Sequence, residues 1–267
     1  MMRDITIGQY YPADSILHRL DPRVKFVSTL VYIISLFVFS SWVGYGVAAL
    51  FLVAMIVLSK VPFGFMVKGL KPIMVLLLIT MFFNLVFTPG EVLWSFWILK
   101  ITKEGIRLAI KMGIRLVFLI IGASIMTLTT TPNQLTDGLE RLLRPLNKIH
   151  VPVHEIAMMM SIALRFIPIL LEETDKIMKA QIARGADFES GNLIQKAKNM
   201  VPLLVPLFIS AFRRANDLAM AMEARCYHGG DNRTQMKPLH YEKRDYAAYG
   251  ILVVYLAVGV AFRVAGL

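Results

Sequence analysis

Long apolar runs, separated by short polar breaks, fill the first half of the chain and return near its C-terminus. A helix that crosses a membrane needs about 20 mostly apolar residues. Five segments approach this length: 24–42, 43–58, 72–87, 106–130 and 246–262. The pattern therefore predicts a multi-pass membrane protein with about five transmembrane helices.

The residues between the fourth and fifth runs follow a different pattern. Thr131-Pro132-Asn133 predicts the start of a helix, because Thr or Asn can cap a helix and Pro suits its first turn. Segments 153–184 and 192–225 each begin apolar and end charged, which predicts two long amphipathic helices. We therefore expect an all-α membrane protein in which these helices form a cytoplasmic domain. The expected parts are a cytoplasmic N-terminal segment, a four-helix transmembrane region, the cytoplasmic domain of long amphipathic helices and a last transmembrane helix, at residues 1–23, 24–130, 131–245 and 246–267.

The composition agrees with burial in a bilayer. Of the 267 residues, 57% are hydrophobic and 18% are charged, whereas an ordinary soluble domain has about 45–50% and about 25%. The formal charge of +11 would suit nucleic acid, an anionic membrane surface or an acidic protein partner. The long apolar runs favour membrane lipid and cytoplasmic protein partners. Since the chain lacks a basic groove interleaved with aromatic residues, we expect no nucleic acid partner.

Lysine and arginine are distributed unevenly, and in membrane proteins they accumulate on the cytoplasmic side. Of the 29 Lys and Arg residues, four lie in 1–25, three in 60–71 and sixteen in 131–245. With five spans, this distribution predicts a protein of the cell membrane with a cytoplasmic N-terminus and an extracellular C-terminus.

Ionisable residues are scarce at mid-depth in the predicted spans. Ion-coupled carriers usually need paired Asp, Glu, Lys or His residues there to hold the ion, so the chain does not resemble a self-sufficient secondary transporter. Arg107, Lys111 and Arg115 share one face of the fourth predicted span. We expect them to reach the membrane interface or to face a protein neighbour.

The chain lacks a complete phosphate-binding loop. Gly64 and Gly69 stand five apart, as such a loop requires, but Leu70 replaces the lysine and no Ser or Thr follows Lys71. We therefore expect no ATP hydrolysis, no catalytic residue and no bound cofactor in this chain.

His150, His154 and Glu155 form a cluster that suggests metal chemistry. Pro152 lies between the two histidines and interrupts any helix that would place both on one face, as a zinc helix requires. We therefore predict no metal site and interpret the three as interfacial polar residues. A membrane-embedded enzyme that uses this cluster stays open as an alternative.

The two long amphipathic segments end in similar sequences. Ala180–Gly185 reads Ala-Gln-Ile-Ala-Arg-Gly, and Ala221–Cys226 reads Ala-Met-Glu-Ala-Arg-Cys. The planar fork of an arginine suits carboxylates at an interface, and the flanking alanines keep each tip narrow. A single arginine at this place would be interpreted as complementing the helix dipole. The repeated context of Arg184 and Arg225 favours docking to a partner instead.

The chain resembles the transmembrane T component of energy-coupling factor (ECF) transporters over nearly its whole length. The resemblance is carried by the two arginine-bearing ends together with two further segments, Leu164-Arg165-Phe166-Ile167-Pro168 and Pro202–Leu207. In that family, two short Ala-Arg-Gly motifs dock cytoplasmic helices onto two ABC-type ATPase subunits. The resemblance also implies an interchangeable substrate-binding membrane subunit, the S component, for vitamins or metal ions. The implied ATPase-docking residues are Ala183, Arg184, Gly185, Ala224, Arg225 and Cys226, where Cys226 replaces the usual glycine.

The resemblance implies a coupling and scaffold subunit of an importer, which transmits ATP-driven motion of the ATPases to the S component for uptake of vitamins or other micronutrients. Met158, Met159 and Met160 are the expected S-component contact, because methionine suits surfaces that accept several partners. Contact with lipid or with the protein core is an equal alternative for these methionines. An ABC permease subunit that binds substrate itself is the second functional alternative, and the sequence does not identify the substrate.

Overall fold

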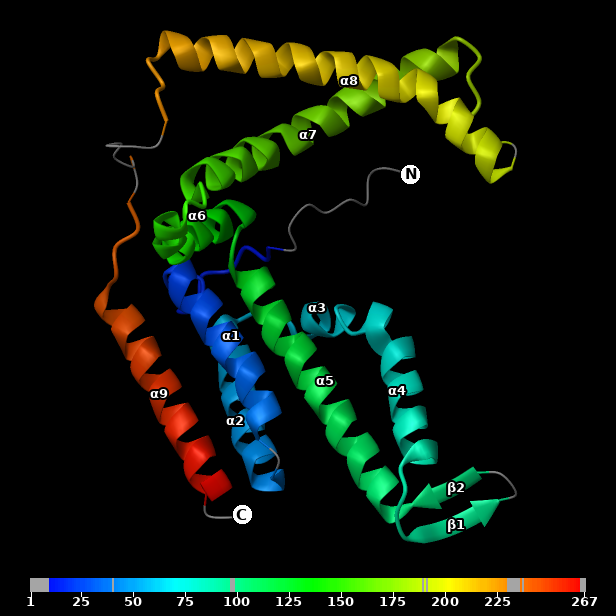
Figure 1. Cartoon of the computed structure of the whole chain (residues 1–267), viewed down its shortest axis with the longest axis vertical. Helices are drawn as coiled ribbons and strands as arrows, with labels where there is room; N and C mark the ends of the chain where they lie inside the picture. The colour runs from blue at the N-terminus through cyan, green and yellow to red at the C-terminus, as the bar shows by residue number, and fades with distance from the viewer. Residues whose placement is uncertain are drawn as a thin grey trace. The chain divides into compact units, whose positions relative to one another are not determined.

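The computed structural model of the chain describes residues 10–39, 41–96, 99–188, 190, 192–229, 236 and 238–264. Its contacts divide the chain into two compact units. The first unit comprises Met1–Gly138 and Leu239–Leu267, and the second comprises Leu139–Pro238. Each unit has its own long helices, which are labelled in Figure 1.

Apolar helices that pack side by side make up most of the first unit. They are α1 (Pro22–Val38), α2 (Trp42–Ser59), α3 (Phe63–Lys68), α4 (Met74–Phe87), α5 (Lys103–Thr129) and α9 (Lys243–Val264). Both α1 and α2 pack against α5 and α9, and α4 packs against α5 (Figure 1). The last helix of the chain therefore completes a bundle that the first helices begin.

A short antiparallel hairpin precedes α5. Strand β1 (Val92–Phe96) pairs with β2 (Leu99–Thr102), with Phe96 opposite Leu99 and an irregularity between Val92 and Trp94. All other regular structure among the described residues is helical. The predicted class, an all-α membrane protein, is therefore confirmed.

By length and composition, five helical stretches are suited to cross a membrane. They are Trp42–Ser59, Phe63–Phe87, Lys103–Thr129, Val153–Ala183 and Lys243–Val264. The chain is therefore a multi-pass membrane protein. Helix α1, with 17 residues, lies at the lower end of the roughly 17–25 residues that span a bilayer. The fourth stretch is α7, which the charge distribution places in the cytoplasm; that placement of 131–245 stays a prediction.

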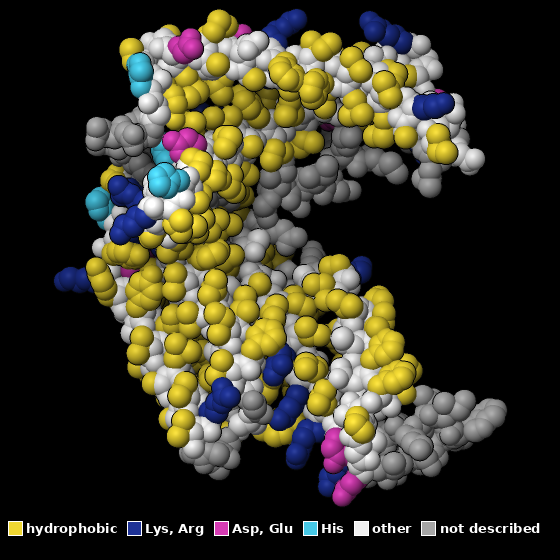
Figure 2. Space-filling model, viewed as in Figure 1, with side chains coloured by type: hydrophobic (Ala, Val, Ile, Leu, Met, Phe, Trp, Pro, Cys, Tyr) yellow, Lys and Arg dark blue, Asp and Glu magenta, His cyan; other side chains and the backbone are white. Residues whose placement is uncertain are grey.

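The outward faces of the first unit are apolar. Figure 2 shows hydrophobic side chains over most of its visible surface. Leu50 on α2 is 75% exposed and Phe87 on α4 is 70% exposed. Exposed apolar area on this scale marks a surface that is covered by another phase or protein, and the bilayer provides that cover.

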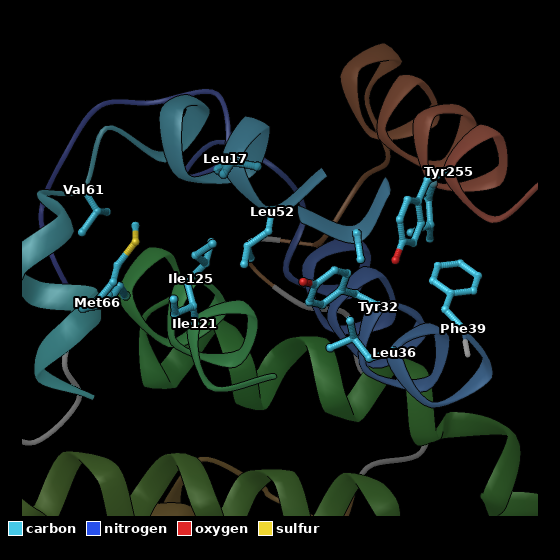
Figure 3. Packing of buried hydrophobic residues seen from close by; sticks show 13 residues of the cluster. Leu17, Tyr32, Leu36, Phe39, Leu52, Val61, Met66, Ile121, Ile125 and Tyr255 are labelled. Atoms are coloured by element: carbon cyan, nitrogen blue, oxygen red, sulfur yellow. The ribbon is translucent and has the colours of Figure 1, made fainter. Parts of the chain in front are cut away.

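The core of the first unit lies where α1, α2, α5 and α9 meet (Figure 3). Tyr255 of α9 meets the edge of the Phe39 ring, with 5.9 Å between ring centroids. Two glycines allow this close packing. A Cβ atom at Gly122 would lie 2.7 Å from the Tyr32 ring, and one at Gly259 would overlap the Phe39 ring. Side chains larger than hydrogen at these two positions would push the helices apart.

Polar contacts close the end of the unit at which α1 and α9 begin. Asp245 is 1% exposed, and its carboxylate accepts a hydrogen bond from the Asp21 amide. Asp21 caps α1 by accepting from the Arg23 amide at 2.8 Å, and its carboxylate pairs with the Arg23 guanidinium at 2.6 Å. Lys25 Nζ donates to the Thr129 carbonyl at 2.8 Å. The start of α1 is thereby bonded to α9 and to the end of α5.

The basic face of α5 contacts aromatic residues of α2. Arg115 Nε donates to Tyr45 Oη at 2.9 Å. Lys111 Nζ lies 5.4 Å from the centroid of the Trp42 ring, a cation–π geometry. The expectation that these cations face a protein neighbour is confirmed for both residues.

The second unit is dominated by two long helices. Helix α6 (Pro132–Leu143) crosses the boundary between the units, and a 3₁₀ segment at Arg144–Ile149, α7 (Val153–Ala183) and α8 (Leu193–Ala224) follow it. Thr131 and Gln134 form a reciprocal cap at the start of α6, with hydrogen bonds of 3.1 and 3.3 Å. The predicted helix start at Thr131 and the two predicted long helices are confirmed.

Candidate functional site

The C-terminal turn of α7 has a specific backbone geometry. Gly185 follows Arg184 and has a φ of +89°. The Gly185 amide donates to the Ile182 carbonyl at 2.9 Å, and the Ala186 amide donates to the Gln181 carbonyl at 3.0 Å. These two bonds form a Schellman motif, which satisfies carbonyls that the end of a helix leaves unpaired.

The C-terminal turn of α8 repeats this geometry. Cys226 follows Arg225 and has a φ of +55°. The Cys226 amide donates to the Glu223 carbonyl at 2.8 Å, and the Tyr227 amide donates to the Met222 carbonyl at 3.0 Å. The cysteine therefore adopts the left-handed backbone that glycine adopts at the end of α7. This backbone costs a residue other than glycine about 1–2 kcal/mol.

Both arginine tips are accessible. All six predicted docking residues are exposed: Ala183, Arg184, Gly185, Ala224, Arg225 and Cys226. Among the described residues, neither guanidinium has a hydrogen-bond or ion-pair partner. A cation at a helix C-terminus is favourable in itself, but the five N–H donors of each fork stay available to a partner.

The fold does not bring the two tips together. Helices α7 and α8 run in opposite directions. This is shown by the contact of Gln181, near the end of α7, with Pro202, near the start of α8. Correspondingly, Met159 near the start of α7 and Met222 near the end of α8 line one groove. At a rise of about 1.5 Å per residue, the tips that carry Arg184 and Arg225 are separated by on the order of 40 Å.

A proline in α8 explains the contact between Gln181 and Pro202. Pro206 has no backbone N–H, so the carbonyl of Pro202, four residues earlier, lacks its donor within the helix. Gln181 Nε2 donates to this carbonyl at 3.2 Å. An ion pair between Glu173 and Arg214, at 3.0 Å, joins the same two helices. Neither contact was predicted from the sequence, although the spacing of the two prolines predicts a free carbonyl.

Helices α7 and α8 diverge toward the start of α7, as Figure 1 shows. Residues of both helices line an apolar groove of about 390 Å³. Met159 and Phe166 line it from α7, and Leu218 and Met222 line it from α8. Of the three methionines predicted as partner contacts, Met159 faces the groove and is 58% exposed. Met160 is 44% exposed outside the groove lining, and Met158 is half-buried.

Helix α8 carries a further apolar surface that sequence analysis did not identify. Its members recur every three or four residues, as one helical face requires, and each is at least half exposed: Val201, Leu204, Val205, Phe208, Ile209 and Phe212. The rings of Phe208 and Phe212 contact each other, with 4.9 Å between centroids. The spacing is visible in the sequence, so a search for exposed apolar faces would have found it.

The residues of the enzyme alternative do not converge. His154 Nδ1 pairs with Glu140 Oε1 at 2.9 Å, and His150 takes a left-handed backbone at the end of the 3₁₀ segment. Among the described residues, no group of three His, Cys, Asp or Glu side chains is arranged to hold a metal ion. Gly64, part of the incomplete phosphate-loop pattern, lies within the short helix α3 and not in a loop.

Comparison with known proteins identifies close relatives. The sequence model of the CbiQ family, described as cobalt transport protein, matches residues 13–236. A protein of Clostridium kluyveri is 58% identical over 266 residues, which cover 99% of this chain and 98% of that protein. A protein of Bacillus subtilis is 46% identical over 259 residues, covering 97% and 98%, and one of Lactococcus lactis subsp. cremoris is 46% identical over 245 residues, covering 91% and 92%. Each of the three is named energy-coupling factor transporter transmembrane protein EcfT.

Proposed function

The chain belongs to the CbiQ family of cobalt transport proteins, and on this premise we propose that it is the transmembrane coupling subunit of an ECF-type ABC importer. The name of the relatives, energy-coupling factor transporter transmembrane protein, supports this proposal. These relatives match the chain over nearly their whole length. The subunit transmits motion of two ATPase subunits to an S component that binds vitamins or other micronutrients. It holds no nucleotide and catalyses no reaction itself.

The observation that carries this proposal is the matched pair of helix ends. Arg184 and Arg225 each follow a long helix, each precedes a residue with left-handed backbone, and each is exposed. A separation on the order of 40 Å is too large for one side-chain groove. It suits two separate subunits, each of which receives one arginine in an acidic groove.

Contacts between α7 and α8 explain how motion at one tip would reach the other. Glu173 with Arg214 and Gln181 with Pro202 hold the C-terminal part of α7 against α8. A displacement of either ATPase therefore moves the pair and not a single helix. The apolar groove at Met159 and the apolar face of α8 around Phe208 are the surfaces on which the S component would follow this motion.

The proposal is tested with the complete complex in proteoliposomes. Arg184→Ala together with Arg225→Ala should abolish co-purification of the ATPases and ATP-dependent uptake of the S component's ligand. Arg213→Ala, at another exposed arginine of α8, is the control and should leave both intact. Full assembly and uptake by the double variant would contradict docking at the tips. ATP hydrolysis by the chain purified without any ATPase subunit would contradict its non-catalytic role.

A further inference from the structure

The basic face of α5 consists of three cations at intervals of four residues: Arg107, Lys111 and Arg115. Figure 2 shows Lys and Arg side chains in the lower part of the first unit, with hydrophobic side chains on both sides of them. Leu108 and Ile110 of α5 itself are exposed apolar residues beside this face. The basic face therefore belongs to a surface that is otherwise apolar and that the bilayer covers.

Carboxylates that could neutralise these cations are scarce in this part of the chain. Residues 24–130 contain only two acidic side chains, Glu91 and Glu104. The Glu104 carboxylate accepts a hydrogen bond from the Glu91 amide at 2.8 Å. Among the described residues, neither Arg107 nor Arg115 is in an ion pair. The basic face therefore keeps a positive charge that an anionic partner would neutralise.

Aromatic contacts place the basic face at the depth of the lipid headgroups. Trp42, whose ring lies beside Lys111, is the first residue of α2 and is exposed. Because Trp rings favour the membrane–water interface, Lys111 lies at this interface. Arg115 and Tyr45, which are hydrogen-bonded, lie about one turn deeper on α5 and α2. Arg107 precedes Lys111 by four residues and therefore lies about 6 Å farther out of the bilayer.

An apolar stripe of α1 continues from the basic face into the bilayer. Arg115 Cζ lies 5.2 Å from the centroid of the Phe37 ring, near the end of α1. Phe37 belongs to an exposed face whose members recur every three or four residues: Leu30, Ile34 and Phe37. The start of α1 is bonded to the end of α5 through Lys25 and Thr129, so α1 runs opposite to α5. Leu30 therefore lies about 10 Å deeper in the bilayer than Phe37.

We propose that the basic face of α5 binds an anionic phospholipid of the bilayer. The lipid phosphate accepts hydrogen bonds from Lys111 and a neighbouring arginine, and one acyl chain lies along the apolar stripe of α1. A phospholipid presents a phosphate and then acyl chains in this order from the surface of a leaflet inward. An acidic protein segment would match the charge alone, whereas a phospholipid matches both the charge and the adjoining apolar stripe.

The missing carboxylates and the side of the membrane bear on the kind of lipid. Since no carboxylate neutralises Arg107 or Arg115 among the described residues, a lipid with a net negative charge is favoured over a zwitterionic one. The lipid belongs to the leaflet at which α5 begins. In the predicted topology this is the outer leaflet, where Lys and Arg are otherwise scarce. Lipid binding accounts for three cations on that side.

The test uses the fluorescence of Trp42 in the full-length chain, reconstituted in liposomes. Trp94→Phe and Trp97→Phe leave Trp42 as the only tryptophan of the chain, and lipids with brominated acyl chains quench a tryptophan that they contact. Brominated phosphatidylglycerol should quench Trp42 more than the same fraction of brominated phosphatidylcholine. The preference should be about five-fold or more, since one Lys or Arg near anionic lipid contributes roughly this factor. Equal quenching by the two lipids would overturn the proposal.

Neutral variants identify the residues that cause the preference. The triple variant Arg107→Gln, Lys111→Gln and Arg115→Gln should be quenched equally by the two lipids. Arg107→Gln alone removes no hydrogen bond or ion pair among the described residues and should lower the preference, which keeps the test decisive if the triple variant does not fold. A preference that survives in both variants would overturn the site.

A matched control neutralises three exposed lysines outside the basic face: Lys71→Gln, Lys148→Gln and Lys179→Gln. This control should keep the full preference for phosphatidylglycerol. Loss of the preference in the control would show a general effect of charge and would overturn the site. A triple variant of the basic face that keeps the lipid preference but no longer co-purifies with an S component would identify a protein-binding surface instead.

Discussion

The buried carboxylate of Asp245 accepts a hydrogen bond from the backbone amide of Asp21 at 2.9 Å, although the two residues are 224 positions apart. The other oxygen of Asp245 accepts from the Glu242 amide at 2.8 Å. One carboxylate thus accepts a hydrogen bond from the turn that leads into α9 and another from the residue that caps α1. The first and last helices of the first unit begin at a shared polar contact.

Asp245→Ala should lower the free energy of unfolding by about 1–3 kcal/mol, because the Asp21 amide would be buried without an acceptor. Asp245→Asn should cost less, since it keeps one acceptor oxygen. Thermal unfolding of the purified protein in detergent measures the difference. Asp217→Ala, at an exposed carboxylate of α8, is the control. A midpoint for Asp245→Ala equal to that of the control would show that the contact contributes no stability.

Cys226→Gly should stabilise the turn after α8 by about 1 kcal/mol, because glycine adopts positive φ without the steric cost that cysteine bears. Hydrogen exchange of the Cys226 and Tyr227 amides, which close this turn, should slow about five-fold. Gly185→Ala is the matched opposite change, at a φ of +89°, and should accelerate exchange at the end of α7. Unchanged exchange in both variants would contradict the strain argument.

Arg184→Lys should weaken binding of the ATPases, and Arg184→Glu should weaken it further. Lysine keeps the charge but loses the two-donor fork, whereas glutamate is repelled by an acidic groove. A charged hydrogen bond contributes about 1.5–3 kcal/mol, so the Kd for glutamate should rise at least ten-fold. Biolayer interferometry with the chain in nanodiscs measures the Kd. Lys179→Glu, at an exposed charge of the same helix, should change it little; an equal effect there would indicate a general charge effect.

An externally added thiol reagent should label a cysteine placed at Ser95 in intact cells and should not label one placed at Asn192. The reason is the excess of Lys and Arg in 131–245, which favours the cytoplasmic side. Cys226 should be changed to Gly in both variants, because it is exposed and would react itself. Labelling at Asn192 without permeabilisation would show that the segment between α7 and α8 is not in the cytoplasm.

Acidification should destabilise the protein partly through His18. Burial lowers the pKa of this imidazole below its ordinary value of 6.5, despite a hydrogen bond to the Tyr11 carbonyl. A lowered pKa in the folded state means that the unfolded chain binds the proton more readily. The contribution of His18 is therefore complete above about pH 6.5 and is lost as the pH falls below it. The unfolding midpoint of His18→Gln should fall less between pH 7.5 and pH 5.5 than that of the unchanged protein; equal decreases would exclude His18 as the cause.

Local patterns in the sequence predicted most of the helices and both candidate tips. Apolar run length identified α2 and α5, since a helix that crosses a bilayer must be long and apolar over its whole length. Thr131 marked the start of α6, and the segment predicted as 153–184 ends one residue beyond the end of α7. Caps and stops depend on residues within one turn, so they can be recognised without knowing which helices pack together.

The sequence by itself determined that the chain is helical, membrane-embedded and equipped with two similar arginine-bearing helix ends, because these features follow from periodicity and from neighbouring residues. The tertiary structure alone decided that Arg184 and Arg225 lie at opposite ends of an antiparallel pair, that Gln181 satisfies the carbonyl left free by Pro206, and that Asp21 meets Asp245. It also decided that Phe37 and Trp42 lie beside cations of α5. Such relationships join residues far apart in the chain, and their free energy depends on which helices pack together, which no local pattern specifies.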